Sequence, residues 1–456
     1  MRACLPLAIL GCLLLAGCIP DVVSISRDGT IALTLRDNGE FEAVEGDQNL
    51  YLTNATADFL TKIDGMENCV CPQISPSGRL IVAPSEEGLL LYDRETKKRR
   101  VIYRGPKGAG DFSVSFPVWS PDEQKIAFFA GDFEESVPDC ALIVYRLDRR
   151  ELEVLDRRAS PRATWLPDSN RLLYISLPPG VSEDSEEPQF GDLKIINLKT
   201  GKRNTLARRQ LFAYSKIALF PEGKAVLFPR VEWDGMEMRP GGITARVLLR
   251  KELLPRLRTR AEKEKRREAE GAEVPKLEEP EAQPSAAETE APETEEQPEE
   301  RSFDLAGGRP VFPYTCAVSP DGQKIAYARY LWVPRPAERE EPEEEETKGQ
   351  PEETGEEEPS EVDQQDRGPD GVEFCVSRAD GTGTIVVGRS LEEGLPLVLW
   401  ISNTRLLCAS WEGITVVDAD GKNKLDLVEA IGKKFADQFE KEEEKEGSGS
   451  EAGEKE

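Results

Sequence analysis

Two cysteines separated by a single residue, Cys69 and Cys71, are the pattern in this chain closest to a metal or redox site. Metal and redox pairs usually have two residues between the cysteines, whereas only Val70 lies between these. In a predicted strand the two side chains would share one face, and a free cysteine packs as a small buried hydrophobe. We therefore expect buried cysteines, with a disulfide or a metal site as the alternatives. The same expectation applies to four later cysteines, Cys140, Cys316, Cys375 and Cys408.

The chain contains no histidine. Histidine is the commonest general base and the commonest metal ligand, so Ser-His-Asp and Cys-His catalysis are excluded. Carboxylate chemistry, as in a glycosidase or lyase, is the enzymatic alternative that the composition leaves open.

The stretch Asp418-Ala419-Asp420-Gly421 faintly resembles a calcium-binding loop. Its glycine comes too early for an EF-hand and no glutamate closes the loop, so we predict a hairpin turn. The sequence thus predicts no catalytic, cofactor-binding or metal-binding residue.

The first residues have the features of a secretory signal peptide. A basic start at Arg2 precedes an apolar stretch from residue 5 to residue 15, which is too short to span a bilayer comfortably. The following Leu15-Ala16-Gly17-Cys18 resembles the lipobox of bacterial lipoproteins. This resemblance implies that residues 1–17 are removed and that Cys18 is acylated, with palmitate or a similar chain, and holds the protein on a membrane.

Ile19 follows the lipidation site. By resemblance to lipoprotein sorting in Gram-negative bacteria, a residue other than aspartate at this position favours the outer membrane over the inner one. The expected location is the cell envelope, facing the periplasm or the exterior.

The net charge of −28 is concentrated in three Glu-rich segments, residues 261–301, 337–370 and 433–456, and the remainder is nearly neutral. Such segments cannot bury enough apolar surface to offset chain entropy. We expect the first two to be disordered insertions and residues 429–456 to form a short helix and a charged tail. No basic stripe is present to neutralise phosphates, so a nucleic-acid partner is not expected.

A turn of the form Ser-Pro-Asp-Gly recurs along the chain between two short apolar runs. Pro presets the turn, Asp bonds its own backbone and Gly accepts a positive φ. Seven versions are recognised, beginning at Ser26, Ser75, Ser120, Leu166, Phe220, Ser319 and Ser402.

The residues around each turn follow a four-strand pattern. In the third copy we predict strands at Val114–Ser120, Lys125–Ala130, Leu142–Tyr145 and Leu152–Leu155. A period of roughly 40–50 residues with four strands per repeat is typical of a β-propeller. We predict an all-β propeller over residues 18–428, with seven blades and with six or eight as alternatives.

The run from Ser319 to Tyr327, Ser-Pro-Asp-Gly-Gln-Lys-Ile-Ala-Tyr, and the stretch from Trp119 to Asp122 resemble the WD-like repeats of the TolB-type propeller superfamily. The resemblance covers nearly all of residues 21–428 outside the insertions and implies the fold, not an activity. The first predicted strand begins soon after Cys18, which leaves no room for the N-terminal α/β domain of the Tol-system protein.

Up-and-down blades place the Ser-Pro-Asp-Gly turns on one face. We expect residues 261–301 to link blades five and six and residues 337–370 to link two strands of blade six, so that both insertions and the anchor lie on the opposite face. Trp119, Trp165 and Trp400 precede three of the turns, and we expect them to pack between blades. A C-terminal helix should pack on the edge of a blade through Leu427, Val428, Ile431, Phe435 and Phe439.

These features favour a lipid-anchored binding or scaffold module for a protein, peptide or glycan, bound on the face that carries the insertions. The alternative is a carboxylate-dependent glycosidase or lyase acting at the centre of the propeller.

Overall fold

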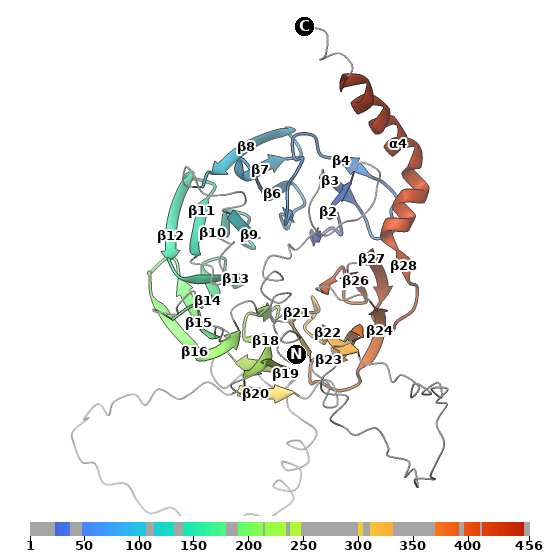
Figure 1. Cartoon of the computed structure of the whole chain (residues 1–456). Helices are drawn as coiled ribbons and strands as arrows, with labels where there is room; N and C mark the ends of the chain where they lie inside the picture. Colours follow the sequence, from blue (N-terminus) through green and yellow to red (C-terminus); the bar gives the residue numbers. More distant parts are fainter. Residues whose placement is uncertain are drawn as a thin grey trace, which may run out of the picture.

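The computed structural model describes residues 23–36, 48–105, 114–131, 140–178, 190–212, 215–233, 238–247, 300–303, 311–331, 370–391, 396–410 and 413–450. In this part of the chain, seven four-stranded antiparallel sheets form the blades of a ring (Figure 1). The predicted all-β propeller is confirmed. No helix of the described residues is long and apolar enough for a membrane span.

Each blade is built from four consecutive strands. Blades one to four comprise β1 (Val23–Ile25), β2 (Ile31–Arg36), β3 (Gln48–Thr53), β4 (Thr61–Lys62); β5 (Gln73–Ile74), β6 (Leu80–Ser85), β7 (Gly88–Asp93), β8 (Lys98–Tyr103); β9 (Val114–Trp119), β10 (Lys125–Ala130), β11 (Ala141–Arg146), β12 (Glu151–Asp156); and β13 (Ala159–Trp165), β14 (Arg171–Ser176), β15 (Phe190–Asn197), β16 (Arg203–Phe212).

The remaining blades are followed by one helix. Blades five to seven and the helix comprise β17 (Ala218–Leu219), β18 (Ala225–Trp233), β19 (Met238–Val247), β20 (Glu300–Phe303); β21 (Val311–Val318), β22 (Lys324–Leu331), β23 (Gly371–Arg378), β24 (Ile385–Ser390); β25 (Leu397–Trp400), β26 (Arg405–Ser410), β27 (Gly413–Asp418), β28 (Leu425–Asp426); and α4 (Leu427–Ser450).

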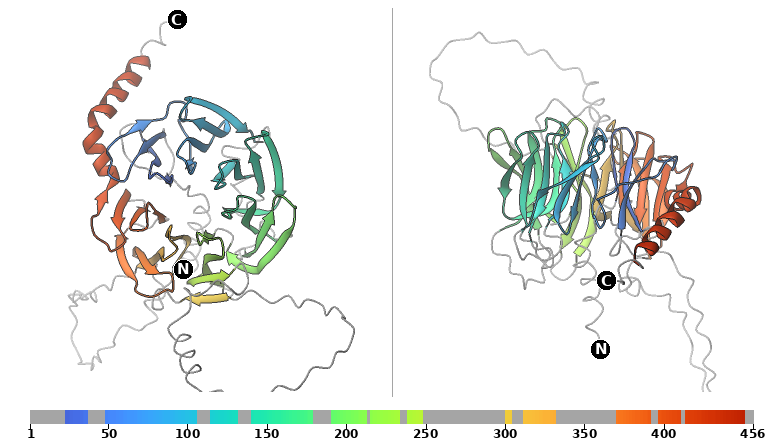
Figure 2. Two further views of the ribbon diagram at one scale, coloured as in Figure 1. Left: turned by 180° about the vertical axis from the view of Figure 1, so that it is seen from behind. Right: turned by 90° about the horizontal axis from the view of Figure 1, so that it is seen from above.

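The strands run between two opposite faces of the ring (Figure 2). We call the face with the first-to-second and third-to-fourth connections the turn face, and the face with the other connections the loop face. Ile25 pairs with Ile31 across the first turn, so β1 begins at the loop face. Alternating side chains of each strand fill the space between neighbouring blades, and the core is a set of clusters between blades.

The expectation that both acidic insertions lie on one face is wrong. Arg246 near the end of β19 pairs with Glu300 at the start of β20, so the first insertion separates the third and fourth strands of blade five. It therefore leaves from the turn face and does not link two blades. The insertion between Leu331 and Gly371 lies between the second and third strands of blade six, on the loop face, as predicted.

Residues 300 and 301, assigned above to the first insertion, belong to β20. The predicted disorder of the two insertions stays a prediction, because residues 261–299 and 337–369 lie outside the described residues. The predicted signal peptide and Cys18 also lie outside them.

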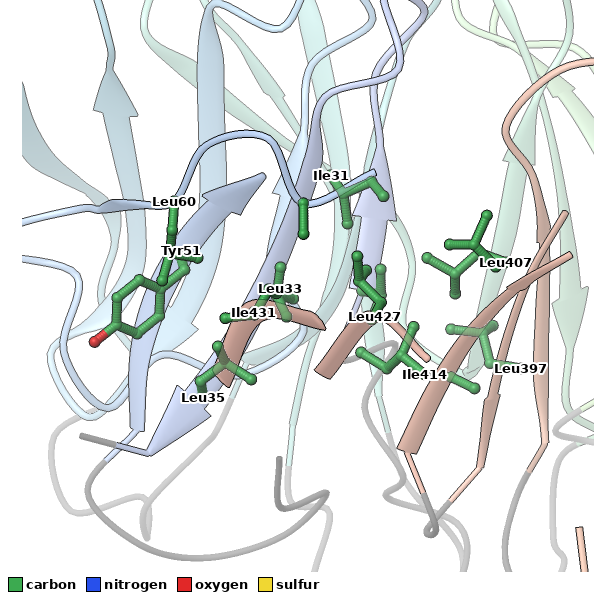
Figure 3. Packing of buried hydrophobic residues seen from close by; sticks show 14 of the residues in the cluster. Ile31, Leu33, Leu35, Tyr51, Leu60, Leu397, Leu407, Ile414, Leu427 and Ile431 are labelled. Carbon is green, nitrogen blue, oxygen red and sulfur yellow. The ribbon is translucent and has the colours of Figure 1, made fainter. Parts of the chain in front are cut away.

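Helix α4 occupies the junction where blade seven meets blade one (Figures 1 and 3). It begins at Leu427, the first residue of the predicted helical pattern and two residues before the predicted segment boundary at residue 429. The Asp426 carboxylate caps it by accepting a hydrogen bond from the Glu429 N–H at 2.9 Å. Leu427, Ile431 and Phe439 are buried in one cluster with side chains of blades one and seven. The helix therefore fills a seam between two blades, instead of lying on the edge of one.

Polar contacts tie α4 to the turn between β3 and β4. The Lys434 ammonium donates a hydrogen bond to the Thr56 carbonyl at 2.7 Å and lies 3.6 Å from the Asp58 carboxylate. The Phe439 ring packs edge-on against Tyr51 of β3 with 5.9 Å between centroids. Since α4 follows β28 directly, it links the last blade to the first.

Candidate functional site

The Ser-Pro-Asp-Gly turns satisfy their own polar groups. In the blade-six copy, the Ser319 hydroxyl donates to Asp321 Oδ1 at 2.7 Å and accepts from the Lys324 N–H at 2.9 Å, while Asp321 Oδ1 also accepts from the Gln323 N–H at 3.0 Å. Partial burial raises the pKa of Asp321, but these hydrogen bonds outweigh burial and hold the pKa below its ordinary value. The aspartates of these turns are therefore structural.

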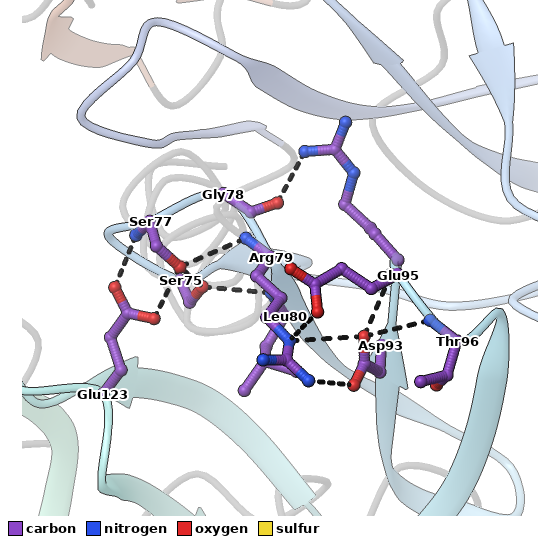
Figure 4. A network of polar contacts seen from close by, with 10 residues as sticks. Ser75, Ser77, Gly78, Arg79, Leu80, Asp93, Glu95, Thr96 and Glu123 are labelled. Atoms are coloured by element: carbon purple, nitrogen blue, oxygen red, sulfur yellow. Dashed lines mark hydrogen bonds and ion pairs between the residues drawn. The ribbon is translucent and has the colours of Figure 1, made fainter.

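Turns of neighbouring blades also bind one another. In blades two and three, the Ser77 hydroxyl donates to Glu123 Oε2 at 2.6 Å (Figure 4). Asp122 N–H donates to the Ser169 hydroxyl at 3.0 Å, and Asp321 N–H donates to Asn403 Oδ1 at 2.9 Å. On the turn face, side-chain hydrogen bonds thus join blades two to three, three to four and six to seven.

The three tryptophans pack between blades, as predicted. Each indole N–H donates to a carbonyl on the innermost strand of the preceding blade. Trp119 donates to Gln73 at 2.9 Å, Trp165 to Val118 at 3.0 Å, and Trp400 to Ala317 at 3.2 Å. These residues fix the spacing of neighbouring blades and do not form a binding ring.

All six described cysteines are buried, and none of them forms a disulfide. Cys69 and Cys71 lie in the connection between β4 and β5, not in a strand as expected. Burial raises the pKa of the Cys69 thiol to about 12, so the thiolate that metal binding or redox chemistry requires is disfavoured. Within the described ranges, no group of three or more carboxylate or cysteine side chains could hold a metal ion.

The stretch from Asp418 to Gly421 is the hairpin turn that the sequence predicts. The Gly421 N–H donates to the Asp418 carbonyl at 2.8 Å, Gly421 has a φ of 83°, and the turn joins β27 to β28.

The innermost strand of each blade faces the axis of the propeller, and these seven strands contain a single charged residue, Arg162 of β13. Neither aspartate nor glutamate occurs in β1, β5, β9, β13, β17, β21 or β25. A carboxylate pair acting at the axis would have to come from elsewhere in the chain.

Three innermost strands depart from regular pairing toward the loop face. The register shifts in β9 between the partners of Ala127 and Phe129, in β13 between Ala159 and Ala163, and in β21 between Val311 and Cys316. A proline lies within each irregularity, namely Pro117, Pro161 and Pro313. Proline removes a ladder donor, and such bulges re-aim side chains and are frequent beside binding sites.

In the bulge of β9, Phe116 has a φ of 48°, in the left-handed region that a bulky residue rarely adopts. The guanidinium carbon of Arg162 lies 4.6 Å from the centre of the Phe116 ring, a cation–π contact between blades three and four. We call Ser115, Phe116 and Arg162 the axial cluster. Strained backbone and a cation on an aromatic face are features of ligand sites.

A serine hydroxyl lies next to this contact without a partner. The Ser115 Oγ is buried and makes no hydrogen bond, and the same holds for Ser215 Oγ, which precedes the innermost strand of blade five. Buried hydroxyl groups are nearly always hydrogen-bonded. These two groups therefore have unused hydrogen-bonding capacity.

A charged group lies farther from the axis, in blade six. The Glu373 carboxylate accepts from Arg329 Nε at 2.8 Å and from Arg389 Nε at 2.9 Å. Burial raises the pKa of Glu373, but the two guanidinium groups outweigh burial and hold the pKa below its ordinary value. This carboxylate is ionised and paired, as in a structural ion cluster.

Sequence reasoning did not identify the axial cluster. Its residues are ordinary in type, and only the register shifts bring Arg162 onto Phe116. The one available signal was the proline near the start of several innermost strands.

No protein-family model matches the sequence, and no curated protein matches it. Solved structures do match in fold. The β-propeller domain of the Trilobed protease from Pyrococcus furiosus, described as having an open velcro topology, is 11% identical with a TM-score of 0.48, and the match covers 89% of this chain and 93% of that one. An oligogalacturonate lyase from Vibrio parahaemolyticus is 12% identical, with a TM-score of 0.49 and coverage of 87% and 88%.

A putative TolB from Agrobacterium tumefaciens is also similar, at 11% identity and a TM-score of 0.36, with coverage of 76% of this chain and 91% of that one. These proteins differ in the activities that their names state. What they share with this chain is the β-propeller fold.

Proposed function

We propose that this protein is a lipid-anchored envelope protein whose propeller is a non-enzymatic binding or scaffold module, and that its protein, peptide or glycan ligand binds at the axial cluster on the loop face. The observation that carries the proposal is the composition of the seven innermost strands. They contain no carboxylate, and their one arginine stacks on an aromatic ring. This surface can bind by cation–π contact and hydrogen bonds. These seven strands contain no carboxylate that could serve as the general acid of a glycosidase.

The pattern of pKa shifts also supports binding over catalysis. For the described carboxylates whose pKa departs from its ordinary value, the change is a decrease, caused by hydrogen bonds and neighbouring cations. A general acid active near neutral pH needs a raised pKa.

The membrane anchor is proposed from the sequence around Cys18 and from the position of β1. Since β1 begins at the loop face with Val23, four residues separate it from Cys18. A linker of this length spans at most roughly 15 Å. We propose that the loop face is held close to the membrane, with the outer membrane favoured over the inner by Ile19.

The anchor is tested by replacing Cys18 with serine in the full-length precursor. The wild-type protein should incorporate an alkyne fatty acid and partition into the detergent phase of Triton X-114, and the C18S variant should do neither. Equal partitioning of the two proteins would contradict the anchor without affecting the binding proposal.

The binding surface is tested by photo-crosslinking in cells with a reactive amino acid at position 115. We expect a discrete crosslinked partner that is lost in Arg162→Gln. The control is Lys422→Gln, at an exposed lysine of the turn face, which should retain the crosslink. Retention in both variants, with unchanged thermal stability, would exclude the axial cluster as the binding surface.

A further inference from the structure

The outermost strand of blade four, β16, and the turn that leads into it are basic. Residues 197–212 contain neither aspartate nor glutamate, in a protein whose net charge is −28. The cations of this stretch are Lys199, Lys202, Arg203, Arg208 and Arg209. In the described sheet β16 pairs with β15 alone, so its other edge is open.

Three of these cations are exposed and form no ion pair with any residue that the structure describes, namely Lys199, Lys202 and Arg208. Arg203 instead donates a hydrogen bond to the Leu155 carbonyl. Unpaired charges at a surface attract groups of opposite sign. The exposed side of β16, which we call the basic surface, therefore favours an anionic neighbour.

Two carboxylates of blade three lie near one end of the basic surface. Glu151 and Glu153 line a groove together with Arg146 and Lys199. Arg146 pairs with Glu153 at 2.9 Å, so one of the two carboxylates is already neutralised. The rest of the basic surface lies outside this groove.

The third-to-fourth connection of the next blade carries the opposite charge. It runs between Val247 of β19 and Glu300 of β20, on the turn face, and its second part, residues 268–299, contains twelve glutamates and one lysine. This acidic half leads directly into β20, the outermost strand of blade five, and β16 packs against β18 of the same blade (Figure 1). The two oppositely charged segments therefore begin on the same face of adjacent blades.

We propose that the acidic half, residues 268–299, binds to the basic surface of β16 through ion pairs of its glutamates with Lys199, Lys202 and Arg208. The segment is tethered one blade away, so its effective concentration at β16 is on the order of millimolar. Several exposed ion pairs, each weak alone, then act together. The contact covers a strand edge that is otherwise open to pairing with another chain. It depends on neither the axial cluster nor the membrane anchor.

Position selects the acidic half over the other acidic parts of the chain. Residues 337–369 leave from the loop face, whereas Lys199 and Lys202 lie in a turn of the turn face. Helix α4 leads the C-terminal acidic residues away from the seam of blades seven and one, across the ring from blade four (Figure 1).

The first part of the same connection is the remaining competitor for the acidic half. Residues 250–267, which we call the basic half, carry nine cations and three glutamates. Pairing of the two halves with each other would leave the basic surface uncovered, and crosslinking distinguishes the two arrangements.

Carbodiimide crosslinking of the full-length protein tests the contact, because it joins carboxylates to lysine amines that touch them. We expect links from the acidic half to Lys199 and Lys202, and none to Lys97 and Lys98, an exposed lysine pair in the corresponding turn of blade two. The links should disappear at about 0.5 M NaCl. A mixture of isotope-labelled and unlabelled protein should show that they form within one molecule. Links to the basic half alone, links between molecules, or no links at all would overturn the proposal.

Cleavage by a glutamate-specific protease gives a readout that does not require a reactive lysine. Lys199→Glu/Lys202→Glu should raise the cleavage rate within residues 268–299 about fivefold, because the repelled segment becomes accessible. The matched control Lys97→Glu/Lys98→Glu makes the same change of charge on blade two and should leave that rate unchanged. Both variants should melt at the temperature of the wild type. Equal cleavage rates in the wild type and the first variant, or an equal rise in the control, would contradict binding at β16.

Discussion

Two arginines bind the same buried carboxylate but differ in their own environment. The Glu373 side chain is 1% exposed, the Arg329 side chain 13% and the Arg389 side chain 62%. Removing one partner of a buried ion pair leaves an uncompensated charge, whereas exposed pairs contribute little because water and salt screen them. Equal hydrogen-bond geometry therefore does not imply equal contribution to stability.

We predict that Arg329→Ala lowers the free energy of unfolding by about 3–5 kcal/mol, because Glu373 loses its buried partner. Arg389→Ala should cost less than about 1 kcal/mol. Denaturant unfolding of the two variants measures both values. Similar losses in the two variants would contradict this difference in burial.

The turn aspartates predict a pH dependence. Burial raises the pKa values of Asp122, Asp168 and Asp321. The hydrogen bonds that these carboxylates accept in the turns have the larger, opposite effect, so each net pKa lies below its ordinary value. A lowered pKa in the folded state contributes stability above the pKa of the unfolded chain, near 4, and this contribution is lost as the pH falls through the folded pKa. The melting temperature should therefore decrease once the pH is lowered below about 4.

The variant Asp122→Asn/Asp168→Asn/Asp321→Asn should show a shallower fall over that pH range, because an amide does not titrate. Thermal melts at a series of pH values check this. Parallel profiles for wild type and variant would show that other groups control acid unfolding.

At this scale, the sequence predicted residues that act through local bonding. The serine, aspartate and glycine of each turn contact one another within a few residues, so their roles follow from spacing. Arg162 and Phe116 are 46 positions apart in the sequence and meet through a bulge, which no local pattern encodes.

At the scale of the element, helix α4 contributes side chains to the core between blades seven and one. Leu427 and Ile431 are fully buried between β-strands of blades one and seven. Phe435 has non-helical torsions within the helix, with φ −122° and ψ 19°, and this break precedes the contact of Phe439 with Tyr51. The residues on both sides of this break therefore pack on the seam.

We predict that Ile431→Ala destabilises the protein by about 2–5 kcal/mol, the usual cost of a large-to-small change at a buried site. Lys433→Ala, at a neighbouring side chain that is 73% exposed, should change stability by less than about 0.5 kcal/mol. Thermal and denaturant unfolding measure the difference. A small effect of Ile431→Ala would mean that the seam does not depend on α4.

Most elements were predictable because each blade repeats one local pattern, but β20 was not. Its four residues, Glu300–Phe303, directly follow a Glu-rich segment, and its apolar content is too low to stand out from that segment. Pairing with β19, across an insertion, decides its place. This single strand reversed the predicted face of the first insertion.

At the scale of the whole molecule, the seams of the ring are not equivalent. The tryptophans join blades two to three, three to four and six to seven through hydrogen bonds between blades. The seam between blades seven and one depends instead on side chains of α4. This seam joins the first blade to the last, which are not consecutive in the chain, and segments that can fray open at lower free energy.

We predict that the ring opens first at this seam. In native-state hydrogen exchange, the amides of α4, β3 and β27 should lose protection together, before those of β10 and β14. Mass spectrometry of peptic fragments resolves these segments. Earlier exchange in β10 or β14 would place the weakest seam elsewhere.

The position of α4 after all seven blades has a consequence for how the protein is made. Chains emerge from the N-terminus and fold in that order, so blade one is complete long before the helix that covers its flank. Until then, Leu33, Leu35 and Tyr51, which are fully buried in the finished ring, face solvent. We therefore expect a chain that ends before residue 427 to expose this apolar flank and to be prone to aggregation.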